Sequence, residues 1–99
     1  MAEDDDLRRT VAERVNKLRS LDHAGVQSLP SLVREVLLEG KIRIAQYHDV
    51  LSSGEHMVVV QALRDRLLGL STAIEIDGFV VSNDGSRRAL SDEETWPFL

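Results

Sequence analysis

The sequence contains no cysteine, which excludes disulfide bonds, thiolate nucleophiles and zinc sites built on sulfur. No apolar run approaches the roughly 18 residues that a membrane-spanning helix requires, so we expect no contact with a bilayer. The acidic N-terminus, MAEDDDLRR, lacks the apolar segment of a secretory signal. The six glycines form neither a G-x-G pattern nor a phosphate-binding loop, and no serine lies in a G-x-S-x-G motif. These absences predict a cytoplasmic protein without a nucleotide-binding or nucleophile motif.

The composition is that of a single small globular domain spanning residues 1–99, since 42% of the residues are apolar and 29% are charged. The net charge of −5 is unevenly distributed, because residues 3–6 and 92–94 hold seven of the 17 acidic side chains. The body of the chain therefore contains ten acidic residues and 12 lysines and arginines. We therefore expect an acidic, flexible N-terminus over residues 1–6 and a separate C-terminal tail over residues 91–99.

The first long element is predicted to be a helix over residues 5–21. Arg14 falls inside its apolar stripe, so its guanidinium must extend along the edge of the stripe to reach water. The stripe repeats at spacings of three and four residues, as an amphipathic helix requires, and consists of Leu7, Val11, Val15, Leu18 and Leu21.

A second helix is predicted to begin at Ser28 or Pro30, with residues 32, 33, 36 and 37 as its buried side. Gly40 leaves two alternatives open. If Gly40 ends the helix, residues 41–44 alternate charged and apolar side chains and form a short strand before a helix over residues 45–51. If the helix continues, residues 33–51 form a heptad pattern. The helix penalty of an interior glycine favours the break.

A third helix is predicted over residues 54–70. Ser52 and Glu55 have the spacing of a capping box at its start. The run Val58–Val60 is β-prone and apolar on three faces, so part of it must be buried between two neighbours or against a partner chain. The apolar positions of this helix are His56, Val60, Leu63, Leu67 and Leu70.

The last third of the chain changes to an alternating pattern. Asp77-Gly78 predicts a tight turn between strands at residues 73–76 and 79–82, with Ile74 and Ile76 facing inward and Glu75 outward. Asn83-Asp84-Gly85 predicts a second turn before a third strand over residues 86–90. Ser91 and Glu94 form a second capping-box pattern, on one short helical turn. The predicted fold class is α+β, with three helices packed on a small antiparallel β-hairpin or meander.

The element order is also that of a winged helix, which makes a DNA-binding transcriptional regulator the alternative function. Arg8, Arg9, Arg87 and Arg88 are the residues that would then contact nucleic acid. The charge pattern disfavours this alternative, because the recognition helix would begin Glu55-His56-Met57 and present no arginine or lysine to the groove.

Two histidines flank the Ser52–Gly54 turn, in the pairs His48-Asp49 and Glu55-His56. Imidazole and carboxylate groups are ligands for zinc, iron or manganese, but this spacing matches no familiar metal motif. The sequence therefore predicts no metal site, no cofactor and no catalytic centre.

We expect a small acidic, non-catalytic interaction or regulatory module that binds protein, either a second copy of itself in a homodimer or a different chain. A domain of this size leaves apolar surface that a partner can cover, and tryptophan and phenylalanine are favoured interface anchors. The predicted partner-binding residues are Val60, Leu63, Leu67, Trp96 and Phe98.

Overall fold

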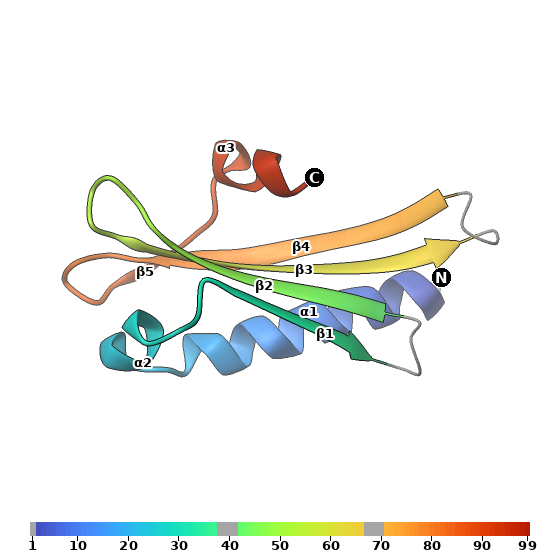
Figure 1. Cartoon of the computed structure of the whole chain (residues 1–99), viewed down its shortest axis with the longest axis horizontal. Helices are drawn as coiled ribbons and strands as arrows, with labels where there is room; N and C mark the ends of the chain where they lie inside the picture. The colour runs from blue at the N-terminus through green and yellow to red at the C-terminus, as the bar shows by residue number, and fades with distance from the viewer. Residues whose placement is uncertain (1, 38–41, 67–70) are drawn as a thin grey trace.

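The computed structural model describes residues 2–37, 42–66 and 71–99. Within these ranges the chain forms one five-stranded antiparallel sheet, in which every strand pairs with its neighbours in sequence in the order β1-β2-β3-β4-β5 (Figure 1). The elements are α1 (Ala2–Arg19), α2 (His23–Gln27), β1 (Leu32–Leu37), β2 (Ile42–Val50), β3 (His56–Arg66), β4 (Ser71–Val81), β5 (Arg87–Ala89), α3 (Asp92–Thr95) and the 3-10 turn η2 (Trp96–Phe98).

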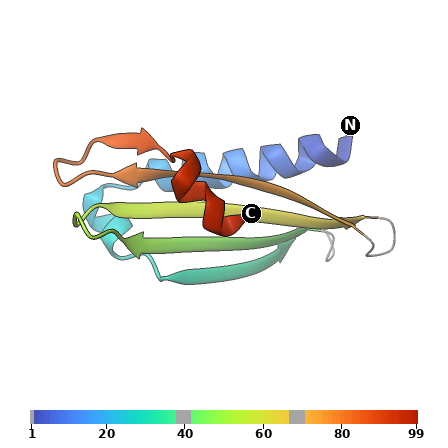
Figure 2. The same cartoon turned by 90° about the horizontal axis from the view of Figure 1, so that it is seen from above.

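The sheet separates two layers of unequal size. The long helix α1 lies along one side, here called the helix face, mainly over β3 and β4. The short α3–η2 segment lies on the other side, here called the outer face (Figure 2). Because successive strand residues point to opposite sides, each strand contributes one set of side chains to each face. No helix in the described part of the chain combines the length and apolarity needed to cross a membrane.

The larger core lies between α1 and the helix face. The predicted stripe of the first helix is confirmed, and four of its members are buried there: Leu7, Val11, Val15 and Leu18. α1 runs from Ala2 to Arg19, so it begins before the predicted start, includes the acidic segment and ends before Leu21. The sheet side of this core is formed by Ile42, Ile44, Val58, Val60, Ala62, Phe79 and Val81.

A smaller core lies under the C-terminal segment on the outer face. Met57, Val59 and Val80 form its buried centre. The partly buried side chains around them are Tyr47, Leu51, Ile76, Leu90 and Phe98. The tail therefore covers one part of the outer face, and no other described element covers the rest (Figure 2).

The prediction of three helices packed on a hairpin is wrong, and the predicted winged-helix order of elements is therefore wrong as well. The predicted second helix is strand β1, the predicted helix 45–51 is part of β2, and the predicted helix 54–70 is β3 as far as Arg66. A set of apolar residues four apart lies on one face of a strand as well as on one face of a helix. The sheet gives β-branched residues such as Val58–Val60 cover on both faces at once, which a surface helix does not. Gly40 and Leu67 lie outside the described residues.

The predicted hairpin at Asp77-Gly78 is also wrong, because β4 runs without a break from Ser71 to Val81. Ile74 and Ile76 consequently lie on the outer face, while Glu75 lies toward α1 and pairs with Arg8 at 3.9 Å. Ser52–Gly54 forms the turn between β2 and β3 and not a helix cap.

Two signals near the C-terminus are confirmed. The turn at Asn83–Gly85 joins β4 to the short strand β5, and Gly85 adopts the positive φ of 87° that such a turn requires. The Ser91–Glu94 capping box is present at the start of α3.

Candidate functional site

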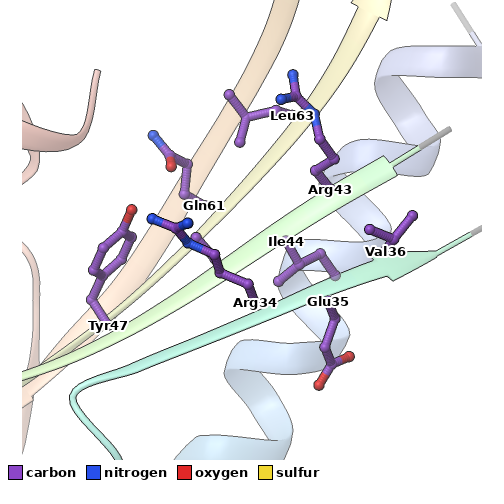
Figure 3. Close-up of a pocket in the computed structure, with 9 residues that line it drawn as sticks. Arg34, Glu35, Val36, Arg43, Ile44, Tyr47, Gln61 and Leu63 are labelled. Carbon is purple, nitrogen blue, oxygen red and sulfur yellow. The ribbon is translucent and has the colours of Figure 1, made fainter. Parts of the chain in front are cut away.

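The uncovered part of the outer face carries a shallow groove of about 330 Å³. Three neighbouring strands, β1, β2 and β3, supply its lining (Figure 3). We call it the outer groove and define it by Arg34, Glu35, Val36, Arg43, Ile44, Ala45, Tyr47, Gln61 and Leu63.

Strand register explains the shape of the groove. Arg34 is paired with Ala45, and Ala45 with Gln61, so these three residues form one row across the sheet. Ala45 has only a methyl group, which leaves a depression between the two longer side chains on either side. Figure 3 shows the Arg34 guanidinium extending from β1 toward Tyr47 and Gln61. A parallel row contains Val36, Arg43 and Leu63.

Among the described lining residues, Arg34 and Arg43 carry positive charge, and their surroundings differ. Arg43 forms an exposed ion pair with Asp65 at 3.0 Å. Arg34 is exposed and has no hydrogen bond or ion pair with any residue that the structure describes. The Asp65 carboxylate offsets the charge of Arg43, so this pair adds little net charge to the groove. Arg34 therefore supplies its unbalanced charge.

The acidic residue of the groove is turned to the other side of the sheet. Arg14 of α1 contacts both carboxylate oxygens of Glu35, at 2.6 and 3.1 Å, and also donates to Gln46 at 3.3 Å. The hydrogen bond from this guanidinium holds the pKa of Glu35 below its ordinary value of 4.5. Glu35 is therefore a carboxylate already bound to a cation and is not available to a ligand in the groove.

The C-terminal segment packs against two of the residues that line the groove. Gln61 donates its side-chain amide to the carbonyl oxygen of Phe98, and the Tyr47 and Phe98 ring centroids are 4.9 Å apart. These contacts fix Tyr47 and Gln61 in place beside Arg34. Apolar residues continue the surface, since Leu32 is 42%, Val36 63% and Ile74 41% exposed.

The structure distributes the predicted partner-binding residues over different environments. Leu63 lines the outer groove. Phe98 packs against the smaller core, whereas Trp96 is 75% exposed on η2. Val60 is fully buried on the helix face, and Leu67 lies outside the described residues.

Sequence reasoning missed Arg34, Tyr47 and Gln61. These residues come from three strands and meet only through the strand register. The alternation at residues 41–44 indicates a strand there, but it ends at Ile44, since Ile44, Ala45 and Gln46 are all buried.

The four arginines of the nucleic-acid alternative do not form a common patch. Arg8 and Arg9 lie on α1, where Arg8 pairs with Glu75 and Arg9 pairs with Asp6 at 2.6 Å. Both cations therefore have carboxylates beside them, which reduces their attraction for phosphate.

The other two arginines extend to opposite faces of the sheet, because they are successive residues of β5. Arg87 lies over the Phe79 ring on the helix face and donates to the carbonyl of Leu21. Arg88 forms a two-pronged ion pair with Glu94, with contacts of 2.7 and 2.9 Å. The hydrogen bonds from Arg88 lower the pKa of Glu94 to about 2.

The histidines form a hydrogen-bonded chain at the opposite end of the sheet. His48 Nδ1 lies 2.9 Å from the carbonyl oxygen of Leu29, and His48 Nε2 lies 2.8 Å from His56 Nδ1. Since a carbonyl only accepts, the neutral pair has a proton on Nδ1 of both rings. The His23 ring approaches His56 edge-on at 5.8 Å. Burial, and then the charges of His48 and His23, lower the pKa of His56.

This chain differs from a metal centre. The two facing nitrogens already share a proton, so they do not offer two lone pairs to one ion. Asp49 accepts from the backbone of Val50, and Glu55 accepts from Ser53 and Ser82, so both carboxylates face other groups. Among residues 2–37, 42–66 and 71–99, no three histidine, aspartate or glutamate side chains are grouped to hold a metal ion.

Comparisons of the chain with protein families, with curated proteins and with solved structures find no match.

Proposed function

We propose that this protein is a non-catalytic binding module and that the outer groove and its apolar rim dock another polypeptide. The observation that carries the proposal is the half-covered outer face. The C-terminal tail buries one part of it, while Leu32, Val36 and Ile74 remain exposed on the sheet around the groove. Exposed apolar side chains gain free energy when a partner displaces the water over them.

The chemistry of the groove favours binding over catalysis. Its described lining contains no histidine, serine or threonine, and the carboxylate of Glu35 is bound to Arg14. A general acid–base mechanism usually relies on a histidine or carboxylate that faces the substrate, and the one phenol of the described lining, on Tyr47, packs against Phe98. A cationic Arg34 between a tyrosine and a glutamine is instead a typical recognition surface, because arginine and tyrosine are enriched at interface hot spots.

Site-specific photo-crosslinking tests this proposal. A benzophenone amino acid placed at Val36 samples the rim of the groove, and the same group at Asp84 samples an exposed turn remote from it. We expect a discrete polypeptide adduct from position 36 in an extract of the source cells and none from position 84. The adduct should disappear when Ile74→Asp places a charge on the rim, while the melting temperature stays close to that of the parent protein because Ile74 is exposed.

Equal labelling from positions 36 and 84, or an adduct that is insensitive to Ile74→Asp, would contradict the proposal. An adduct with twice the mass of the chain would identify a second copy as the occupant.

A further inference from the structure

The outer groove is bordered by a free strand edge. β1 pairs with β2 and with no other described strand, and α1 lies mainly over β3 and β4. Alternate residues of an edge strand direct their backbone N–H and C=O groups away from the sheet. These groups can pair with an added strand, which is a common mode of peptide recognition.

The outer side of β1 presents an alternating row of three exposed side chains, Leu32, Arg34 and Val36. A strand added to this edge places one of its residues directly opposite each member of the row. The residue opposite Arg34 meets a guanidinium that has no other described partner, whereas the residues on either side of it meet apolar side chains.

From this arrangement we infer that the partner is an extended segment of a different protein, which adds to the edge of β1 beside the outer groove and places an aspartate or glutamate next to Arg34 between two apolar residues. This inference rests on the proposed function and specifies its partner. A carboxylate at this position gains a charge-assisted, two-pronged hydrogen bond with arginine.

A second copy of this chain fits the edge poorly. In an antiparallel pair related by a two-fold axis, residues of the same face lie opposite each other. The two longest ladders that β1 forms with itself are centred on residue 34 or on residue 35. The first places Arg34 against the second Arg34, and the second places Glu35 against the second Glu35. Like charges directly opposite one another destabilise a strand pair.

Binding of designed peptides to the whole chain tests the inference. The probe is a fluorescent peptide with the sequence Thr-Val-Thr-Glu-Thr-Val-Thr, in which the glutamate and valines match Arg34, Leu32 and Val36. The control peptide has lysine in place of glutamate. We expect the glutamate peptide to bind about tenfold or more tightly than the lysine peptide, with the largest amide shifts in nuclear magnetic resonance spectra at residues 32–37.

Matched variants separate a local contact from the effect of net charge. In Arg34→Glu the preference should reverse, so that the lysine peptide binds more tightly. Arg9→Glu makes the same change in net charge on α1, and we expect it to leave the preference unchanged. Each variant alters an exposed side chain, and its circular dichroism spectrum shows whether the fold is retained.

Several outcomes overturn the inference. Failure of the glutamate peptide to bind, equal binding of both peptides, or tighter binding of an oligothymidylate than of the glutamate peptide would each do so. A dimer seen in sedimentation experiments and abolished by Ile74→Asp would also overturn it, since the occupant would then be a second copy. The photo-crosslinking result would still decide the proposed function, so the two failures are distinguishable.

Discussion

Replacement of Gly78 by alanine tests the close contact between β3 and β4. Gly78 is paired with Val59 within the longest ladder of the sheet. A methyl group at Gly78 would lie 2.1 Å from the carbonyl oxygen of Val58 and 3.0 Å from the Cα of Val59. Both contacts are with backbone atoms, so a side-chain rotation in β3 does not relieve them. The methyl is accommodated only if the two strands separate.

The cost follows from the size of this separation. An ordinary carbon–oxygen contact is about 3.3 Å or longer, so the strands must move apart by about 1.2 Å at this point. Such a shift lengthens the neighbouring ladder hydrogen bonds beyond their effective range. Each bond lost in a buried region costs about 1–3 kcal/mol, and overpacking adds a similar amount. We therefore expect Gly78→Ala to lower the free energy of unfolding by at least about 3 kcal/mol, which corresponds to about 12 °C or more in melting temperature.

Urea and thermal unfolding monitored by circular dichroism measure this loss. The control is Gly85→Ala, where a methyl group meets no atom within 4 Å and only the positive φ of 87° opposes it. That backbone strain costs roughly 1–2 kcal/mol. A Gly78→Ala protein that melts within a few degrees of the parent would refute the close strand contact. Gly78→Asn distinguishes a strand from a turn at this position. Asparagine is tolerated in a tight turn, but in a strand it meets the same obstruction as alanine, so we expect this variant to be destabilised as well.

Three further predictions concern charged groups. The pKa of His56 is lowered in the fold, so the unfolded chain binds more protons and the free energy of unfolding should fall as pH decreases below 6.5. Urea unfolding at pH values above and below 6.5 measures this dependence, and His56→Gln should make the free energy of unfolding less dependent on pH. Arg14→Ala removes the cation from a partly exposed Glu35, which should cost about 1–2 kcal/mol in urea unfolding and return the pKa of Glu35 toward 4.5; an unchanged unfolding midpoint would contradict this. Because the pKa of Glu94 is lowered to about 2, the stabilisation by its carboxylate is complete above pH 4.5 and is lost as the pH falls toward about 2. Arg88→Gln should raise the pKa of Glu94 in a carbon-detected titration. An unchanged pKa would rule out the ion pair as the cause of the shift.

The parts of the fold that could be predicted are those in which local chemistry determines structure. The stripe of α1 extends over several helical turns, and no strand reproduces its spacing over that length. The Ser91–Glu94 box and the turn ending at Gly85 each depend on a few adjacent residues. None of these features requires knowledge of a distant part of the chain.

The central strands were misread because they are covered on both faces. Val58 and Val60 are buried against α1, while Met57 and Val59 are buried under the C-terminal segment. Burial on both faces removes the polar–apolar alternation by which a strand is recognised. The remaining apolar spacing of four and three residues then resembles a helix. The β-branched character of Val58–Val60 was the more informative signal.

The outer groove could be predicted only in part, because register brings its residues together. Leu63 was identified as a contact residue, but on a helical surface and not beside Arg34. Gly78 shows the same limitation: its role depends on the nearness of Val58 in another strand, whereas the sequence Asp77-Gly78 indicates a turn by itself.

The order of α1 and its partner strands along the sequence has a consequence for synthesis. Ribosomes make α1 before the strands that it packs against, β3 and β4, which end at Arg66 and Val81. The apolar stripe of α1 therefore stays exposed to water until these two strands have been synthesised. Each hairpin, in contrast, can form as soon as its own two strands are made. The interval between these events is when the nascent chain most needs protection from aggregation.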